Sequence, residues 1–520
     1  MRLDKFDFVE VENTPFGKVI LIGMMEDGPT GVPFKLLENT DTTFLIGDNE
    51  VSRTYNLLVS NGIQRDDIIL LRINGEPAKL RIDILEGIGI NLQALTSNHF
   101  DNDIKVTVSS GGISITSNYS EELIVEGKRE QFQRTYLFND FPFTSELTEA
   151  ITKDALLGYH NIIADYDTVV PTTIMSFFED EYFFDGGKTE SELVLKNGTF
   201  DDSCEDCLES KEDFLEAYWD RFHYHLLGSD FDGVTSNKIS NIEAEVIYFP
   251  DVLIDEMPEL AILGGRIAKE QTENQDVLCT ALFRPSITLK EKHLNKEDEK
   301  TEQTNYVNKL VDLFTVEELS FKEMKNVQIV IGEDYSTNRN IMPAAAYHLV
   351  HLLSQDLNPL SNKELEYFYQ LKTTLSKIEI EKLIDKGYIC TMESIRKNIV
   401  TTKTQSLYSG TKLKDSFYQS RILSYITHDV RNMLDNSFVG KNISLYNLYD
   451  VEYRLTEYLQ QYVDARLISS FSLGERVDDS VGYSSNIGID IVMFGEIEAI
   501  KGSLKLNESG WEVDIWNLMN

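Results

Sequence analysis

The residues with the most direct capacity for chemistry are a cysteine pair and a Gly-Lys-Thr triplet. Cys204 and Cys207 have the spacing of half a zinc site, but the chain has no second CxxC and no Cys/His pair at a suitable distance. The triplet at Gly187 matches the end of a phosphate-binding P-loop, but Tyr182 occupies the position of the first glycine of that loop. We therefore predict no metal ion and no nucleotide cofactor at either place.

A histidine and acid cluster is the next candidate for a cation site. His223 and His225 are alternate residues, and alternate residues on a helix point in different directions, so they do not share a ligand-binding face. The following Asp230-Phe-Asp232-Gly233 resembles part of a calcium loop, but Ile239 stands where that loop needs its bidentate acid. The calcium interpretation therefore fails.

The sequence contains no motif for nucleophilic catalysis. Gly-x-Ser-x-Gly and His-Glu-x-x-His are both absent. His348 and His351 have the spacing of ordinary helix packing, and the Gly87-Ile-Gly89 turn lacks the third glycine of a dinucleotide loop. We predict no catalytic residue and no enzyme, and keep an α/β hydrolase-like or other small-molecule-binding enzyme as the alternative.

Length and charge limit the classes of partner. A chain of 520 residues with 42% hydrophobic residues is long enough for three or four domains. Its 48 Lys and Arg residues against 87 Asp and Glu residues give a net charge of -39, which disfavours nucleic acid and anionic membranes as partners. Four cysteines without a framework spacing are typical of a reducing compartment, and neither a secretory signal nor an apolar run of membrane-spanning length is present.

Strand and helix periodicities predict a multidomain α/β protein in six parts. Both ends alternate polar and apolar residues like β-strands without partners, and a middle stretch of short alternating segments predicts a β-rich inserted domain. The parts are an N-terminal arm (1–16), an N-terminal α/β part (17–87), the β-rich inserted domain (88–207), an α/β middle domain (208–394), an α+β C-terminal domain (395–506) and a C-terminal arm (507–520).

Within these parts the patterns predict particular elements. Strands are expected at 18–23, 67–73, 104–108, 112–116, 243–249, 276–282, 327–331, 488–494, 503–506 and 511–516. Helices are expected at 50–61, 257–270, 305–317, 342–354, 415–435 and 445–463. The charged stretch 290–304 is expected to be an exposed, partly disordered loop, and the acidic stretch 201–209 a solvated linker.

Several segments, in order, resemble the contractile tail sheath proteins of bacteriophages and related injection machines. Each motif is short, and their order along the chain carries the resemblance. The N-terminal motifs are Val19-Ile-Leu-Ile-Gly23, Glu26-Asp-Gly-Pro29, Val32-Pro33, Phe44-Leu-Ile-Gly47 and Leu71-Arg-Ile-Asn-Gly75 with Ala78; the C-terminal motifs are Leu383-Ile-Asp-Lys-Gly-Tyr-Ile389, Val400-Thr-Thr402, Ser420-Arg421-Ile422, Val430-Arg-Asn-Met-Leu434 and Phe438-Val-Gly-Lys441.

The resemblance implies a structural subunit without a cofactor, which polymerises as stacked hexameric rings around an inner tube and contracts to drive the tube through a cell envelope. It implies as partners other copies of the chain, the tail tube protein, and baseplate and tail terminator proteins. It places the protein in a virion tail assembled in the cytoplasm of a bacterial host. A bacteriocin or cellular injection system is equally compatible with these motifs.

Two sets of residues follow for such an assembly. Terminal arms are exchanged between neighbouring subunits in this family, and the matching apolar positions here are Phe6, Phe8, Val11, Trp511, Val513 and Ile515. The tube is expected to meet the C-terminal domain, where residues 395–440 carry seven basic residues against three acidic ones. The predicted tube-facing residues are Arg396, Lys397, Lys403, Lys412, Lys414, Arg421 and Arg431.

Overall fold

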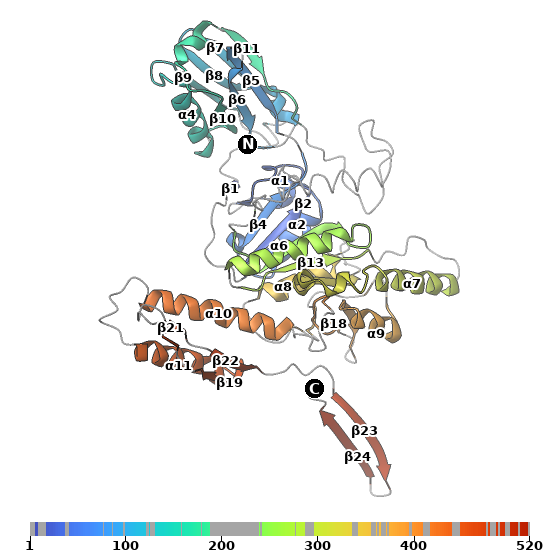
Figure 1. Ribbon diagram of the computed structural model, residues 1–520. Helices are drawn as coiled ribbons and strands as arrows, with labels where there is room; N and C mark the ends of the chain where they lie inside the picture. The colour runs from blue at the N-terminus through green and yellow to red at the C-terminus, as the bar shows by residue number, and fades with distance from the viewer. Residues whose placement is uncertain are drawn as a thin grey trace. The chain divides into compact units, whose positions relative to one another are not determined.

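The structure is a computed structural model of the chain, and it forms two compact units, residues 1–257 and 258–520. The fold is a mixed α/β architecture with several separate sheets (Figure 1). The residues described are 6–8, 17–36, 41–75, 77–85, 87–96, 99–120, 124, 131–157, 159–177, 179–187, 239, 242–275, 277–286, 296–334, 342–354, 360, 363–365, 371, 374–394, 398–408, 417–438, 448–474, 477–478, 485–486, 489–493, 500–507 and 510–517.

The first unit contains a run of five neighbouring strands in the order β1-β3-β4-β2-β12. Strand β2 pairs in parallel with both β4 and β12, while β3 is antiparallel to β4 and to β1. Every residue of β2 and β4 is buried, as expected for parallel strands covered on both faces. The bounds are β1 Phe6–Phe8, β2 Val19–Gly23, β3 Phe34–Leu36, β4 Ile68–Arg72 and β12 Val246–Leu253.

A short helix, α1 (Thr42–Ile46), and the longer α2 (Glu50–Ser60) connect β3 to β4. Helix α2 starts with a capping box, in which Asn49 and Ser52 each bond the other's backbone N–H. Its buried face includes Tyr55 and Leu58, and it contacts β2 and β12. The predicted helix at 50–61 and strands at 18–23 and 67–73 are therefore confirmed.

A β-rich region, residues 77–187, has its own apolar core. A four-stranded antiparallel sheet (β11-β7-β8-β9), a three-stranded one (β10-β6-β5) and one helix, α4, contribute to that core. Because Ala78, Ile82 and Ile84 lie in this core, the region starts before the predicted boundary at residue 88. The bounds are β5 Lys79–Leu85, β6 Ile88–Ala94, β7 Ile104–Ser109, β8 Gly112–Ser117, β9 Gln133–Leu137, α4 Thr144–Leu156, β10 Ile162–Tyr166, η4 Thr172–Phe177 and β11 Asp180–Phe183.

The second unit contains four neighbouring strands in the order β13-β14-β17-β18. Strands β13, β14 and β17 are parallel, and helices α6, α8 and α9 contact this sheet. The antiparallel pair β17 and β18 continues across the predicted domain boundary at residues 394 and 395. The bounds are α6 Glu259–Gln275, β13 Thr280–Arg284, β14 Val327–Ile331, α8 Ala344–Leu353, α9 Lys377–Asp385, β17 Ile389–Glu393 and β18 Ile399–Thr401.

Helix α7 (Lys296–Val311) corrects the prediction of a disordered charged loop. The segment is rich in Lys, Glu and Gln, which favour helix when nothing opposes it. Contacts with α9 hold it, because Gln303 and Thr304 both donate hydrogen bonds to the Glu379 carboxylate. The helix begins at Lys296, nine residues before the predicted start at 305.

Two long helices and a small sheet form a further core in the second unit. Helices α10 (Phe417–Phe438) and α11 (Leu448–Asp464) pack with the antiparallel strands β19 (Ile468–Leu473) and β22 (Ile489–Met493). Both helices lie where the periodicity predicts them. None of the helices in the described parts of the chain is long and apolar enough to cross a membrane.

The ends of the chain correct the prediction of strands without partners. Residues Phe6–Phe8 pair with β3 in the same chain, with Phe6 opposite Leu36. Strand β24 (Gly510–Asn517) forms a hairpin with β23 (Ile500–Asn507), with Trp511 opposite Leu506. Strands β23 and β24 pair with each other along their whole described length, whereas the pattern of alternating residues alone does not specify the partner.

Candidate functional site

Two N-terminal motifs of the sheath resemblance meet in one buried cluster around Arg72. This arginine is fully buried at the end of β4. Its Nη1 donates to the Gly28 carbonyl oxygen at 2.9 Å and its Nη2 to the Glu26 carbonyl oxygen at 3.4 Å. The Glu26-Asp-Gly-Pro29 turn is thus held on β4 by a guanidinium, whose planar donors suit several carbonyl oxygens at once.

Asn74 joins the same cluster from the other side. Its Oδ1 accepts hydrogen bonds from Arg72 Nε and from the Met25 backbone N–H, and its Nδ2 donates to the Met25 carbonyl oxygen. Gly28 has a φ of +115°, and a Cβ there would lie 3.0 Å from the Phe34 ring, so the turn requires glycine. The hydrogen bonds of these motif residues therefore fix the turn after β2 against the end of β4.

The C-terminal motifs are also structural. Thr402 Oγ1 accepts a hydrogen bond from the Cys390 backbone N–H, and the Thr402 backbone N–H donates to the Cys390 carbonyl oxygen. Tyr388, in the Gly-Tyr-Ile motif, donates its hydroxyl to the Leu310 carbonyl oxygen at 2.7 Å. These contacts join α7, β17 and the segment after β18.

Arg421 corrects the prediction of a tube-facing residue. Only 6% of it is exposed, and its Nη2 donates to the carbonyl oxygens of Leu352 at 2.7 Å and Ser354 at 3.3 Å. The carbonyl oxygens at the end of α8 have no partners within the helix, and a buried cation satisfies them. Arg421 is therefore engaged inside the unit and cannot face a tube.

The other predicted tube-facing residues divide into two groups. Arg431 is exposed on α10, and Lys403 is partly buried after β18. The remaining four, Arg396, Lys397, Lys412 and Lys414, lie outside the described residues.

Two small sheets present open edges in the described parts of the chain. Strands β19 and β22 pair with each other, and so do β23 and β24. One face of the first sheet packs on α10 and α11 through Phe471, Leu473, Ile491 and Met493, while Val492 is 55% exposed. Such strands can accept a further strand through main-chain hydrogen bonds. The predicted arm residues Trp511, Val513 and Ile515 lie on β24, Phe6 and Phe8 on β1, and Val11 lies outside the described residues.

The described histidine and cysteine residues of the second unit are buried or partly buried and have structural surroundings. His348 is fully buried on α8, where its Nε2 hydrogen-bonds with Gln328 Oε1 in β14, and burial lowers its pKa to about 3. Cys279 and Cys390 are free and buried, and burial raises the pKa of the Cys390 thiol. Among the described residues no group of three His, Cys, Asp or Glu could hold a metal ion.

The remaining rejected motifs have structural partners or lie outside the description. Gly87 lies in the turn of the β5–β6 hairpin, as predicted, and Gly187 exchanges two backbone hydrogen bonds with the Asn102 side chain. Residues 188–238, with Cys204, Cys207, His223 and His225, lie outside the described residues.

Sequence reasoning missed a buried polar chain in the β-rich region. The Ile162 backbone N–H donates to His160 Nδ1, so the neutral ring carries its proton on Nε2, which is 2.7 Å from Tyr136 Oη. Tyr136 Oη in turn donates to Asp154 Oδ2 at 3.0 Å. Burial lowers the pKa of His160 to about 4. The three residues of this polar chain lie on β9, on α4 and in the loop before β10. No local spacing in the sequence could therefore reveal the chain.

The chain matches no family model and no curated protein. It is similar to the solved structure of a sheath tail protein from Listeria innocua, with 13% identity, a TM-score of 0.46 and coverage of 93% of this chain and 96% of that one. It is also similar to a sheath tail protein from Desulfitobacterium hafniense, with 10% identity, a TM-score of 0.43 and coverage of 94% and 98%.

A shorter similarity is to the anti-feeding prophage sheath in its contracted state, with 12% identity and a TM-score of 0.35. It covers 51% of this chain and 70% of that one.

Proposed function

We propose that the chain is the structural subunit of a contractile tail sheath. In this proposal it assembles as stacked hexameric rings around a tail tube, with baseplate and terminator proteins at the ends, in a tail built in the bacterial cytoplasm. The observation that carries the proposal is the convergence of separate sheath-like motifs, Glu26-Asp-Gly-Pro29 and Leu71-Arg-Ile-Asn-Gly75, in one buried cluster. The parallel pairing of β2 with β4 brings these two motifs together, with Gly23 opposite Arg72.

Strand exchange between subunits supplies the link in this proposal. The short β1 strand and the β23–β24 hairpin are terminal pieces, and β19 with β22 forms a small sheet whose edges carry no further strand among the described residues. A terminal strand that leaves its own chain and adds to an edge of a neighbour exchanges one set of main-chain hydrogen bonds for another. The net cost is therefore small, and rings can move relative to one another without separating.

Contraction then needs no nucleotide, because each subunit relaxes from one set of contacts to another and many small gains add up along the tail. The tube-facing surface is proposed to include Arg396, Lys397, Lys412 and Lys414, together with exposed Arg431 and partly buried Lys403. An attraction of opposite charges at an exposed rim is weak and screened by salt, which suits a contact that must release.

The test is electron microscopy of the purified full chain at high concentration, without nucleotide or metal. We expect hollow, striated tubes. Matched variants lack residues 1–16 or residues 500–520, and we expect folded, soluble protein that forms no tubes. Dispersed particles from the full chain at every concentration would contradict the sheath proposal, and normal tubes from both truncations would contradict strand exchange alone.

A further inference from the structure

Helix α10 is buried on two sides. Ile422, Ile426 and Val430 face the core that α10 shares with α11, β19 and β22. Arg421 and His428 are also buried, with 6% and 9% of each exposed, and at about 100° per residue they lie roughly 150° away from that face around the helix axis. Because they are seven residues apart, both side chains leave the same face of α10, about 10 Å from each other along its axis. The second buried side of α10 therefore presents two basic residues.

The two basic residues of this second side each meet the C-terminus of another helix. Arg421 Nη2 donates to the carbonyl oxygens of Leu352 and Ser354 at the end of α8. His428 Nδ1 is 3.3 Å from the carbonyl oxygen of Gln275, the last residue of α6, and it must be the donor because a carbonyl oxygen only accepts. The last carbonyl groups of a helix lack partners within it and carry a partial negative charge, which suits basic side chains. Since α6 and α8 both contact β13 and β14, these helix-end contacts join α10 to the sheet of the second unit.

Among the described residues, the apolar core on the first side of α10 includes no part of that sheet. Its buried residues come from α10, α11 and β19, and the partly buried residues packed against it all lie between 418 and 493. Tyr462 on α11 adds a hydrogen bond within the same group of elements, from its Oη to Asp429 Oδ2 on α10 at 2.6 Å. Helices α10 and α11 with strands β19 and β22 therefore form a helical module with a core of its own (Figure 1).

Opening the helix-end contacts exposes different groups from opening this core. Separating the core exposes apolar side chains to water, whereas water satisfies the released helix-end carbonyl oxygens and hydrates the released guanidinium. Folded proteins open locally in cooperative units, and units held by few buried apolar contacts open most readily. We propose that the helical module detaches from the sheet as one body with its core intact, and that Arg421 and His428 hold it in the docked position.

Detachment allows the β19–β22 sheet to move relative to the β13-β14-β17-β18 sheet. In the proposed sheath, the edges of β19 and β22 accept a strand from a neighbouring subunit, so those intermolecular hydrogen bonds persist while the rest of the subunit changes position. This consequence rests on the proposed function. The opening itself is a property of the single chain and is tested without assembly.

The first test compares thiol reactivities in the dilute full chain carrying Cys204→Ser and Cys207→Ser. A His428→Cys thiol reports opening at the helix ends, and an Ile426→Cys thiol reports opening of the module's core. The two buried native thiols, beside β13 and on β17, report opening of the sheet. Mass spectrometry of labelled peptides follows each site, and we expect the His428→Cys thiol to react about tenfold faster than the others. Comparable rates at all four sites would overturn the proposal.

The second step of this test removes the remaining helix-end contact with Arg421→Met. The His428→Cys thiol should then react about tenfold faster still, because a charged donor is lost, while the Ile426→Cys rate changes less than about twofold. Arg431→Met, an exposed change on the same helix, is the control and should leave every rate unchanged. Equal acceleration of both thiols would show that the module unfolds instead of detaching, and no acceleration of the His428→Cys thiol would show that Arg421 does not hold it. Either result would overturn the proposal.

Hydrogen exchange with the milder variant Arg421→Lys provides an independent measurement. A lysine ammonium lacks the fixed donor geometry of the guanidinium, so residues 351–354 at the end of α8 should exchange severalfold faster. Residues 455–463 of α11 should exchange as in the parent, because the core stays closed, whereas the control Ile426→Ala should accelerate them. Faster exchange at 455–463 in Arg421→Lys, or no change at 351–354, would refute detachment as one body. Since both measurements use the single chain, their outcome does not depend on whether tubes form.

Discussion

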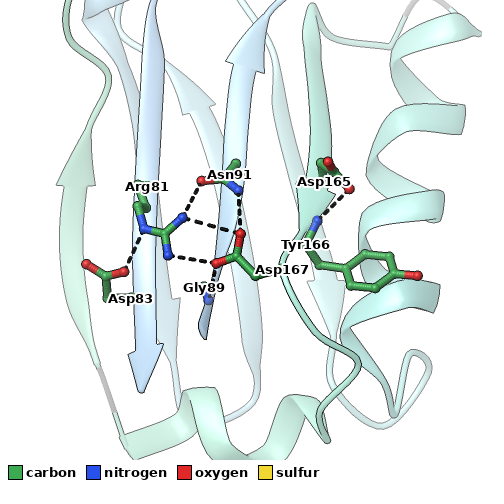
Figure 2. Close-up of polar contacts among 7 residues, drawn as sticks. All are labelled: Arg81, Asp83, Gly89, Asn91, Asp165, Tyr166 and Asp167. Carbon is green, nitrogen blue, oxygen red and sulfur yellow. Dashed lines mark hydrogen bonds and ion pairs between the residues drawn. The ribbon is translucent and has the colours of Figure 1, made fainter. Parts of the chain in front are cut away.

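Arg72 and Arg81 lie nine residues apart in sequence but in opposite environments. Arg72 is fully buried and donates to two backbone carbonyl oxygens and an amide oxygen. The Arg81 side chain is 42% exposed and pairs with the carboxylates of Asp83 and Asp167 (Figure 2). The surface arginine has the ideal charged partners, but water competes for them, whereas nothing replaces the donors of the buried one. Burial, and not the formal strength of the bond, sets the energetic importance of each.

The largest expected effect is the loss of Arg72. Arg72→Met removes a donor from the buried Gly28 carbonyl oxygen and Asn74 Oδ1 and from the partly buried Glu26 carbonyl oxygen, and unfolding free energy should fall by about 4 kcal/mol, since each unsatisfied group costs about 1–3 kcal/mol. This loss of unfolding free energy is measured by denaturant unfolding of the full chain. Hydrogen exchange at residues 19–31 and 68–74 then shows whether the loss is local to the Arg72 cluster. Exchange in the β-rich region serves as the internal control. If Arg72→Met lost no more unfolding free energy than Arg81→Gln, the contrast between the buried and the exposed arginine would be wrong.

The next effect concerns His160 and pH. Its pKa of about 4 in the folded state lies below the ordinary 6.5, so the stability contributed by the neutral ring is complete above pH 6.5 and is lost as the pH falls through 4. A shift of this size corresponds to about 3 kcal/mol. Hydrogen exchange of residues 133–166 between pH 7.5 and 4, corrected for intrinsic rates, should show the loss.

The control for this pH dependence is His160→Asn, which removes the titrating ring. We expect a lower stability at pH 7.5 and a flatter dependence on pH. The same steep dependence in the variant would assign the acid sensitivity to other groups.

Arg421 extends the comparison to a second buried arginine. Arg421→Met leaves the Leu352 and Ser354 carbonyl oxygens without this donor and should lower unfolding free energy by about 2 kcal/mol. Arg431→Met, on an exposed position of the same helix, is the matched control and should have little effect. If instead Arg421→Met were as stable as the parent, the buried role assigned to it would be wrong.

The smallest effect is expected at Arg81. Arg81→Gln keeps a donor for Asn91 and Asp167, and the unfolding midpoint should stay within experimental error of the parent value because the network is exposed. Unfolding curves of both proteins at low and high salt measure the electrostatic contribution of the Arg81 ion pairs that salt screens. A loss comparable with that of Arg72→Met would show that the exposed network contributes far more than its surroundings allow.

Local sequence patterns are enough to predict the buried strands and the amphipathic helices. The apolar runs at 19–23, 68–72 and 327–331 predict buried strands, and the amphipathic periods predict α2, α8, α10 and α11, because strand and helix periodicities differ. The absence of a complete nucleotide, zinc or nucleophile motif was also visible at this level. The order of the sheath-like motifs gave the expected class of protein.

Strand partners and the burial of charged side chains depend on the tertiary fold. The N-terminal strand finds β3 and the last strand finds β23, because pairing depends on which edges the chain brings together. Arg421 looks like a surface charge in sequence, yet the end of α8 supplies carbonyl oxygens that bind it inside the unit. The charge of a side chain is a local property of the sequence, but its exposure and its partners are set by residues distant along the chain. For the same reason the Arg72 cluster depends on the register between β2 and β4, which brings Arg72 opposite Gly23.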